Sequence, residues 1–190
     1  MPVHRRCSWC GTDPQYVAYH DREWGVPVWE PRALFAKLTL DAFQSGLSWL
    51  VVLRKRASIL ETMDHLDPDR LACWDNARIE SALAHPGIIR HRGKLEAAVE
   101  NARRVSELQN SGRCFSDLLW AHVDGSPVMN YWTRNEDVPA QTPASQAMAK
   151  ELKSLGFRWT GPIVCYAFMQ AVGMVNDHLV SCFRHRDCAD

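Results

Sequence analysis

The sequence predicts an all-α fold, and three observations support that prediction. Residues 163–174 contain a single polar side chain, Gln170, so a helix formed there is apolar on nearly every face and must lie in the middle of a core. Turns that contain glycine separate this stretch from the helix-like segments around it. The alternation of apolar and polar residues that is typical of half-buried strands is absent throughout.

The composition describes a globular chain with a sizeable core, since 46% of its 190 residues are hydrophobic. We expect a single globular unit spanning residues 1–190. Basic and acidic residues each total 22, and zero net charge does not by itself indicate nucleic-acid binding. Basic clusters at 54–56, 90–94, 103–104 and 184–186 still allow a local basic face, although such clusters are more often solvated helix surfaces.

The seven cysteines are odd in number, and the N-terminal sequence MPVHRRCSW lacks the apolar run of a signal peptide. A cytoplasmic protein with free thiols or a bound metal follows. The apolar stretch 163–174 is too short to cross a membrane. We therefore expect a cytoplasmic monomer with no membrane partner.

The first third of the chain predicts two helices after an irregular start. Residues 1–30 are crowded with aromatic side chains and show little sign of regular structure, so something else must fix them. A helix is expected from Pro31, with apolar side chains at helical spacing through Leu40. Asp41 is expected to open a second helix that ends in the cations of residues 54–56, and Gly46 interrupts it.

The rest of the chain predicts helices separated by turns. The expected helices are a short one capped by Asp67-Pro68 and reaching Trp74, another ending before His85, a long one over 94–109, one over 115–123, and one from Thr142-Pro143 to Leu155. Residues 88–93 read as a turn and residues 128–141 as irregular.

The segment 156–161 predicts a tight turn between two helices. Gly156 and Gly161 bracket it, and Pro162 follows at a first helical position, where its missing N–H costs nothing. Beside Arg158, the free N–H groups of the second helix would suit a DNA phosphate. An ordinary helix–helix corner explains the same spacing and is the commoner case.

Histidine and cysteine residues near the two ends of the chain suggest a metal site. His178 and Cys182 are spaced i, i+4, which on a helix places both side chains on one face. Together with Cys7 and His20 they would complete a closed tetrahedral zinc shell that fixes the loose N-terminal segment. Cys10, His185 and Cys188 are rival ligands, and composition does not choose among them.

Four segments together resemble the signature blocks of the DNA-3-methyladenine glycosylase I family. They are CSWCGTDPQYVAYHDREWG (7–25), LDAFQSGLSW (40–49), GIIRHRGKL (87–95) and GFRWTGPIVCYAFMQAVGMVNDH (156–178). The resemblance covers nearly the whole chain, with the blocks in the family's order and spacing. It implies a helix-hairpin-helix glycosylase fold and excision of 3-methyladenine from duplex DNA that contains alkylated bases.

The resemblance also implies roles for individual residues. One structural zinc would be held by Cys7, His20, His178 and Cys182, which would clasp segment 7–20 to segment 178–182. The base pocket would be formed by Trp9, Tyr16, Tyr19, Trp24 and Trp49. DNA would be contacted by Gln44, Gly46 and Leu47, which fill the gap left by the extruded base, and by the hairpin turn with Gly156, Arg158 and Gly161. Asp41 would be the catalytic carboxylate that reads the adenine edge.

One departure from the family pattern bears on the activity. Family members typically carry a glutamate where this chain has Asp41, so the pocket is rearranged, the preferred base differs, or catalytic power is reduced. Asp177 follows the hairpin and its helix, and we interpret it as a helix cap or as support for a zinc ligand.

Two other kinds of function remain alternatives at this stage. One is a zinc-stabilised module that binds distorted duplex DNA without catalysis. The other is a zinc hydrolase, against which four protein ligands argue because a catalytic zinc keeps a position open. The matching blocks hold no evident lysine nucleophile, so a glycosylase of this kind would be monofunctional.

Overall fold

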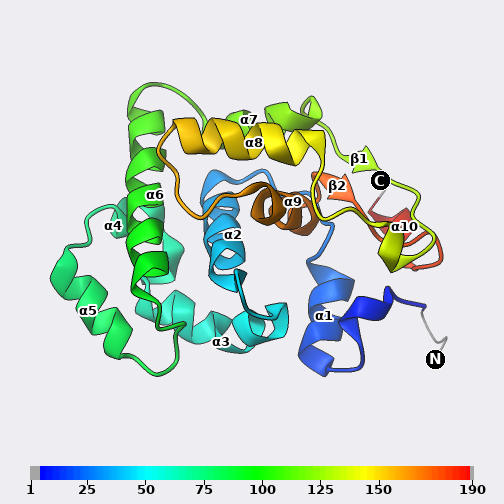
Figure 1. Ribbon diagram of the computed structural model, residues 1–190, viewed down its shortest axis with the longest axis horizontal. Helices are drawn as coiled ribbons and strands as arrows, with labels where there is room; N and C mark the ends of the chain where they lie inside the picture. Colours follow the sequence, from blue (N-terminus) through cyan, green and yellow to red (C-terminus); the bar gives the residue numbers. More distant parts are fainter. Residues whose placement is uncertain (1–4, 189–190) are drawn as a thin grey trace.

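The computed structural model describes residues 5–188, which are mainly helical (Figure 1). The helices are α1 (Pro14–Arg22), α2 (Pro31–Gln44), α3 (Trp49–Thr62), α4 (Pro68–Leu71), α5 (Asn76–Ala84), α6 (Arg92–Asn110), α7 (Phe115–Trp120), α8 (Pro143–Ser154), α9 (Pro162–Ala171) and α10 (Arg184–Asp187). Short 3₁₀ turns lie at Ser8–Cys10, Asp64–Leu66, Ala121–Val123 and Asn135–Asp137. The all-α expectation is wrong only in a small detail, because β1 (Val128–Met129) and β2 (Val175–Asn176) form a two-residue parallel pair.

Helix α9 occupies the centre of the molecule, in contact with α2 and α8 (Figure 1). From Cys165 onward its side chains are mostly buried, as the apolar sequence predicts. Its first turn is different, since Ile163 is 62% exposed. The helix ends at Ala171 because Gly173 adopts a φ of +70°, a conformation that favours glycine.

Several helices begin with the same local chemistry, an oxygen-bearing N-cap followed by proline at the first helical position. The caps are Asp13 for α1, Glu30 for α2, Asp67 for α4 and Thr142 for α8, each accepting backbone N–H groups of the first turn. The expectation of an irregular N-terminal segment is therefore wrong for residues 14–22, which form α1.

The boundary between α2 and α3 also differs from the prediction. Asp41 lies in the last turn of α2 and opens no new helix. The break follows at residues 45–48, where Gly46 has a φ of +79°. Ser48 then occupies the N-cap position of α3, and Trp49 is its first residue.

The C-terminal segment departs most clearly from the helical expectation. Residues 177–182 are irregular, so His178 and Cys182 do not share a helical face. This segment lies beside the start of the chain, because the Phe183 N–H donates to the Arg5 carbonyl at 3.0 Å. None of the helices between residues 5 and 188 is long and apolar enough to cross a membrane.

Candidate active site

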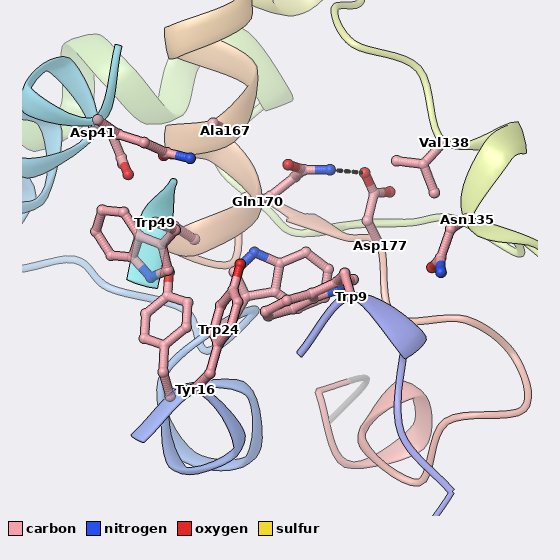
Figure 2. Close-up of a pocket in the computed structure, with 13 residues that line it drawn as sticks. Trp9, Tyr16, Trp24, Asp41, Trp49, Asn135, Val138, Ala167, Gln170 and Asp177 are labelled. Carbon is pink, nitrogen blue, oxygen red and sulfur yellow. Dashed lines mark hydrogen bonds between the residues drawn. The ribbon is translucent and has the colours of Figure 1, made fainter. Parts of the chain in front are cut away.

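A cavity of about 340 Å³ opens where α1, α2, α3 and α9 meet. The five predicted aromatic residues and Asp41 line it, together with Gln44, Asn135, Val138, Ala167, Gln170, Ala171 and Asp177. Figure 2 shows Asp41, Gln170 and Asp177 along one edge and Trp9, Trp24 and Trp49 facing them. No sequence pattern pointed to Asn135 or Val138, whereas Gln170 was marked as the single polar residue of the apolar stretch.

The aromatic residues pack mostly at tilted or edge-on angles. The ring centroids of Trp9 and Trp24 are 4.9 Å apart at 70°, and those of Tyr19 and Trp49 are 5.2 Å apart at 49°. Burial raises the pKa of Tyr19 well above its usual value, and also raises that of Tyr16. Both phenols therefore stay neutral, and the cage offers uncharged, electron-rich rings to a ligand.

Asp41 is the buried carboxylate of this pocket, with only 4% of its surface exposed. Its Oδ1 accepts a hydrogen bond from Lys37 Nζ at 2.5 Å, whereas its Oδ2 has no partner among the described residues. Burial raises the pKa of Asp41, and the Lys37 ammonium opposes that rise. Trp49 Nε1 is also buried without a partner in the same part of the structure.

Asp177 lines the same pocket but is fully occupied by hydrogen bonds. Its Oδ1 accepts from Asn130 and Trp132, and its Oδ2 accepts from Tyr166 and Gln170, at distances of 2.6–2.7 Å. The sequence interpretation of Asp177 is wrong: it caps no helix, and neither oxygen contacts His178. Its carboxylate instead joins α9, β2 and the segment after β1.

The loop 45–48, predicted to enter the duplex, lies between two residues that line the pocket, Gln44 and Trp49. Gln44 lines the cavity, while Gly46 and Leu47 are exposed, Leu47 to 41%. A Cβ added at Gly46 would meet no atom within 4 Å. The loop therefore presents an apolar side chain to solvent on a backbone that a partner can approach closely.

The predicted hairpin turn joins α8 to α9, but its two glycines differ in role. Gly156 has a φ of +87° and ends α8, and an added Cβ would lie 3.2 Å from Arg104 Cδ. Gly161 has a φ of −68°, is the N-cap of α9, and has no atom within 4 Å of an added Cβ. Of the two glycines, Gly161 leaves open space for a close approach, and a contact of Gly156 with DNA stays a prediction.

The turn itself is held in place by its neighbours. Asn101 accepts the Arg158 N–H at 2.7 Å and donates to the Arg158 carbonyl at 3.0 Å. The Arg158 side chain is exposed and has no carboxylate partner within residues 5–188. A cation is thus available beside the first turn of α9.

Lys94 connects the two predicted DNA-contacting segments, and the sequence reasoning missed it. Its buried Nζ donates to the carbonyls of Phe43 and Ser45 at 2.8 and 2.5 Å. The same ammonium lies 5.3 Å from the ring centroid of Trp159 in the hairpin turn. The loop after α2 and the hairpin are therefore neighbours on one part of the surface.

Cys7, His20, His178 and Cys182 converge at one buried point. Their potential ligand atoms all lie within 4.8 Å of one another. Three pairs are 3.5–3.7 Å apart, namely Cys182 with His20, Cys182 with His178, and Cys7 with His178. A tetrahedral zinc with bonds of about 2.0–2.3 Å would separate its ligands by roughly 3.3–3.8 Å, so the spacing suits that metal.

The histidine rings are oriented as metal ligands require. His20 Nδ1 lies 2.8 Å from Asp21 Oδ1, and His178 Nε2 lies 3.0 Å from the Trp24 carbonyl. Because these oxygens only accept, those ring nitrogens carry the hydrogen, and His20 Nε2 and His178 Nδ1 keep lone pairs toward the cysteines. The hydrogen bond between the two thiols lowers the pKa of Cys182 and raises that of Cys7, which favours a thiolate at Cys182.

The rival ligands have other partners. Cys10 Sγ donates to the Cys7 carbonyl at 3.2 Å. His185 Nε2 contacts the Asn130 carbonyl at 2.8 Å. Cys188 is buried but does not belong to the cluster.

Comparisons with known proteins agree over nearly the whole chain. Residues 9–185 match the model of a family described as methyladenine glycosylase. The chain is 42% identical over 177 residues to DNA-3-methyladenine glycosylase 1 of Escherichia coli (strain K12), covering 93% of this chain and 95% of that protein.

Solved structures of related proteins also match this chain over most of its length. A crystal structure of 3-methyladenine DNA glycosylase I matches with a TM-score of 0.93 and 45% identity, over 94% of this chain and 98% of that one. A Staphylococcus aureus structure concerned with 3-methyladenine recognition matches with a TM-score of 0.91 and 31% identity, over 96% and 97% of the two chains.

Proposed function

Since the chain belongs to the methyladenine glycosylase family, we propose that it hydrolyses the N-glycosidic bond of 3-methyladenine in alkylated DNA. The family resemblance predicted from the sequence is confirmed. The observation that carries the proposal is a pair of unsatisfied groups at the aromatic pocket, the acceptor Asp41 Oδ2 and the donor Trp49 Nε1. An adenine edge carries both a donating amine and an accepting ring nitrogen, which are the two kinds of partner that these atoms lack.

The charge of the pocket suits an alkylated base. A 3-methyladenine still joined to its sugar is cationic, and a cation is stabilised over aromatic faces and beside a carboxylate. Trp9, Trp24 and Trp49 supply the faces, and Asp41 supplies the negative charge. An unmodified adenine lacks the positive charge and gains less from the same contacts.

The surface around the pocket suits a duplex from which one base has been extruded. A base cannot be attacked inside the stack, so it must rotate out into the pocket. We infer that Gln44, Gly46 and Leu47 fill the gap that it leaves. Arg158 and the N–H groups at the start of α9, next to Gly161, would bind the backbone phosphates.

The reaction needs little acid catalysis, because the base leaves as a neutral molecule. The bond from the sugar C1′ to the base nitrogen breaks, and its electron pair remains on the base. A water oxygen then bonds to C1′ and loses a proton to solvent. Asp41 stabilises the cationic base as the bond stretches, which is electrostatic help from a group already in place.

We also infer that Cys7, His20, His178 and Cys182 hold one zinc ion. Four protein ligands close the shell, so the ion supplies structure and no Lewis acid for the reaction. It would tie segment 7–20, which contributes Trp9, Tyr16 and Tyr19 to the pocket, to the C-terminal segment. A monomeric state and a cytoplasmic location stay predictions from the sequence.

The test is to incubate methylated duplex DNA with the protein and identify the released bases by chromatography. We expect 3-methyladenine, with Asp41→Asn at least about tenfold slower, which corresponds to roughly 1.4 kcal/mol of transition-state stabilisation. DNA binding without release of any base would instead indicate a module that recognises damage without catalysis. Release at the parental rate by Asp41→Asn would remove Asp41 from the mechanism.

A further inference from the structure

Lys37 lies one helical turn before Asp41 on α2 and is bound to its carboxylate. The Nζ atom donates to Asp41 Oδ1 at 2.5 Å, and its side chain is 16% exposed. The ammonium also sits 3.9 Å from the ring centroid of Trp49 and 5.8 Å from that of Tyr19. One cation therefore contacts the pocket carboxylate and lies near the rings of two aromatic residues that line the pocket.

The charges around this pair are few. Lys37 interacts electrostatically with the Arg56 guanidinium of α3 and with the Glu23 carboxylate after α1. These two groups form an ion pair with each other. Asp41 is faced by the Tyr19 phenol of α1 and the Cys165 thiol of α9. Burial raises the pKa of Tyr19, and raises that of Cys165 to about 12, so both are neutral near pH 7. Burial lowers the pKa of Lys37, and the Asp41 carboxylate opposes that fall. Within residues 5–188, Lys37 is the cation that acts on Asp41.

We propose that Lys37 is a positioning residue that keeps the Asp41 carboxylate ionised and engages one of its oxygens, leaving Oδ2 for the flipped base. The inference rests on the proposed function and extends it to a residue outside the pocket lining. A buried carboxylate without a cation beside it would favour the protonated form. A protonated Asp41 could neither offset the positive charge of 3-methyladenine nor accept from its amine with full strength.

The pair is compatible with the shorter side chain at position 41. A carboxylate on aspartate stays close to its own helix, within reach of a lysine at i−4 on the same face. The lysine stem can extend along the faces of Tyr19 and Trp49 while its ammonium reaches the carboxylate. The pocket is therefore organised around an ion pair, with one oxygen anchored and one free.

The test follows the ionisation of Asp41 in the parent and in Lys37→Met, which keeps most of the side-chain volume. The Asp41 carboxyl signal is titrated by ¹³C NMR, assigned with Asp41→Asn, and kcat/KM for 3-methyladenine release is measured across the same pH range. We expect Lys37→Met to move both midpoints to higher pH by at least about one unit, since a close opposite charge lowers a carboxyl pKa by roughly one to three units. At the alkaline plateau the variant should regain most of the parental kcat/KM.

Two further variants separate charge from packing. Lys37→Arg restores the cation and should restore the parental midpoint. Arg56→Met removes a neighbouring cation that does not contact Asp41 and should leave the midpoint where it is. An unmoved NMR midpoint in Lys37→Met, or an equal loss of activity at every pH, would overturn the inference. A shifted NMR midpoint in a protein that releases no base would uphold the ion pair and refute the glycosylase proposal instead.

Discussion

Two aspartate residues, Asp41 and Asp177, line the same pocket. Their hydrogen bonds indicate different roles. Asp177 accepts four hydrogen bonds, from Asn130, Trp132, Tyr166 and Gln170, so neither oxygen is free for a ligand. Asp41 accepts one and keeps Oδ2 unpartnered. A buried acceptor without a partner is costly in the empty pocket. A bound adenine would remove that cost, so part of the proposed affinity for the base would come from Asp41.

Replacing Asp41 by the family's residue tests how closely the pocket is fitted to the shorter side chain. We expect Asp41→Glu to match or exceed the parental rate, because Asp41 borders a cavity of about 340 Å³ and the flexible Lys37 can follow the carboxylate. Single-turnover release of 3-methyladenine measures the rate, and the melting temperature checks the fold. A rate about tenfold lower with an unchanged melting temperature would mean that the extra methylene clashes and the pocket has adapted to aspartate.

The helices that the sequence predicts correctly have capping residues at their ends. Thr142-Pro143 begins α8, and Gly156 ends it, as the capping pattern requires. Helix α1 carries the same signal in Asp13-Pro14, with Asp13 accepting from Gln15 and Tyr16. It was missed because the surrounding aromatic residues obscure the helical period, not because the information was absent.

The error at residues 178–182 has a different cause. The spacing i, i+4 suits one face of a helix, but ligand geometry requires only that the atoms converge. Gly173 ends α9, and β2 pairs with β1 before His178 is reached. This pairing is a long-range contact that no local pattern reports. The irregular segment 177–182 then brings His178 and Cys182 to the cluster with Cys7 and His20 without a helix.

The two glycines of the hairpin turn allow a matched test of its role in DNA binding. Gly161→Val should lower the melting temperature only slightly, since its φ suits any residue and its surroundings are open, although valine is a poorer N-cap residue than glycine. It should weaken binding to unmodified duplex DNA by about tenfold, roughly 1.4 kcal/mol, because the side chain occupies the space of a phosphate. Fluorescence anisotropy measures this affinity.

Gly156→Val is the control for that prediction. It should lower the melting temperature, because a branched side chain is strained at a φ of +87° and would meet Arg104. The DNA affinity of the folded fraction should change little. Equal losses of affinity in both variants, without the difference in stability, would contradict the division of roles between the two glycines.

At the scale of the whole molecule, the pocket is assembled from segments far apart in the chain. The family resemblance located the aromatic walls, the four potential zinc ligands and the hairpin, and the structure brings each of these sets together. It missed Lys37, Lys94, Asn135 and Val138, whose roles depend on which segment packs against which. Residues 128–141 show no periodicity, so their place at the pocket could be found only from the folded chain.

A zinc ion held by Cys7, His20, His178 and Cys182 would join the two ends of the molecule. Segment 7–20 carries three of the pocket's aromatic residues and contains a 3₁₀ turn and most of α1. We expect one tightly bound zinc per chain, lost in Cys182→Ser. The free energy of unfolding should fall by more than about 4 kcal/mol, as is typical when a structural metal is lost. Elemental analysis and thermal unfolding measure the two effects.

Cys10→Ser is the matched control, since it removes a buried thiol that lies beside the cluster and bonds only to backbone carbonyls. It should keep its zinc and most of its stability. If the clasp shapes the pocket, Cys182→Ser should also weaken the binding of free 3-methyladenine at temperatures where the variant is still folded, measured by quenching of tryptophan fluorescence. Unchanged zinc content in Cys182→Ser, or equal loss of zinc in Cys10→Ser, would refute the ligand assignment, because the four converging atoms would then not be the ones that hold the ion.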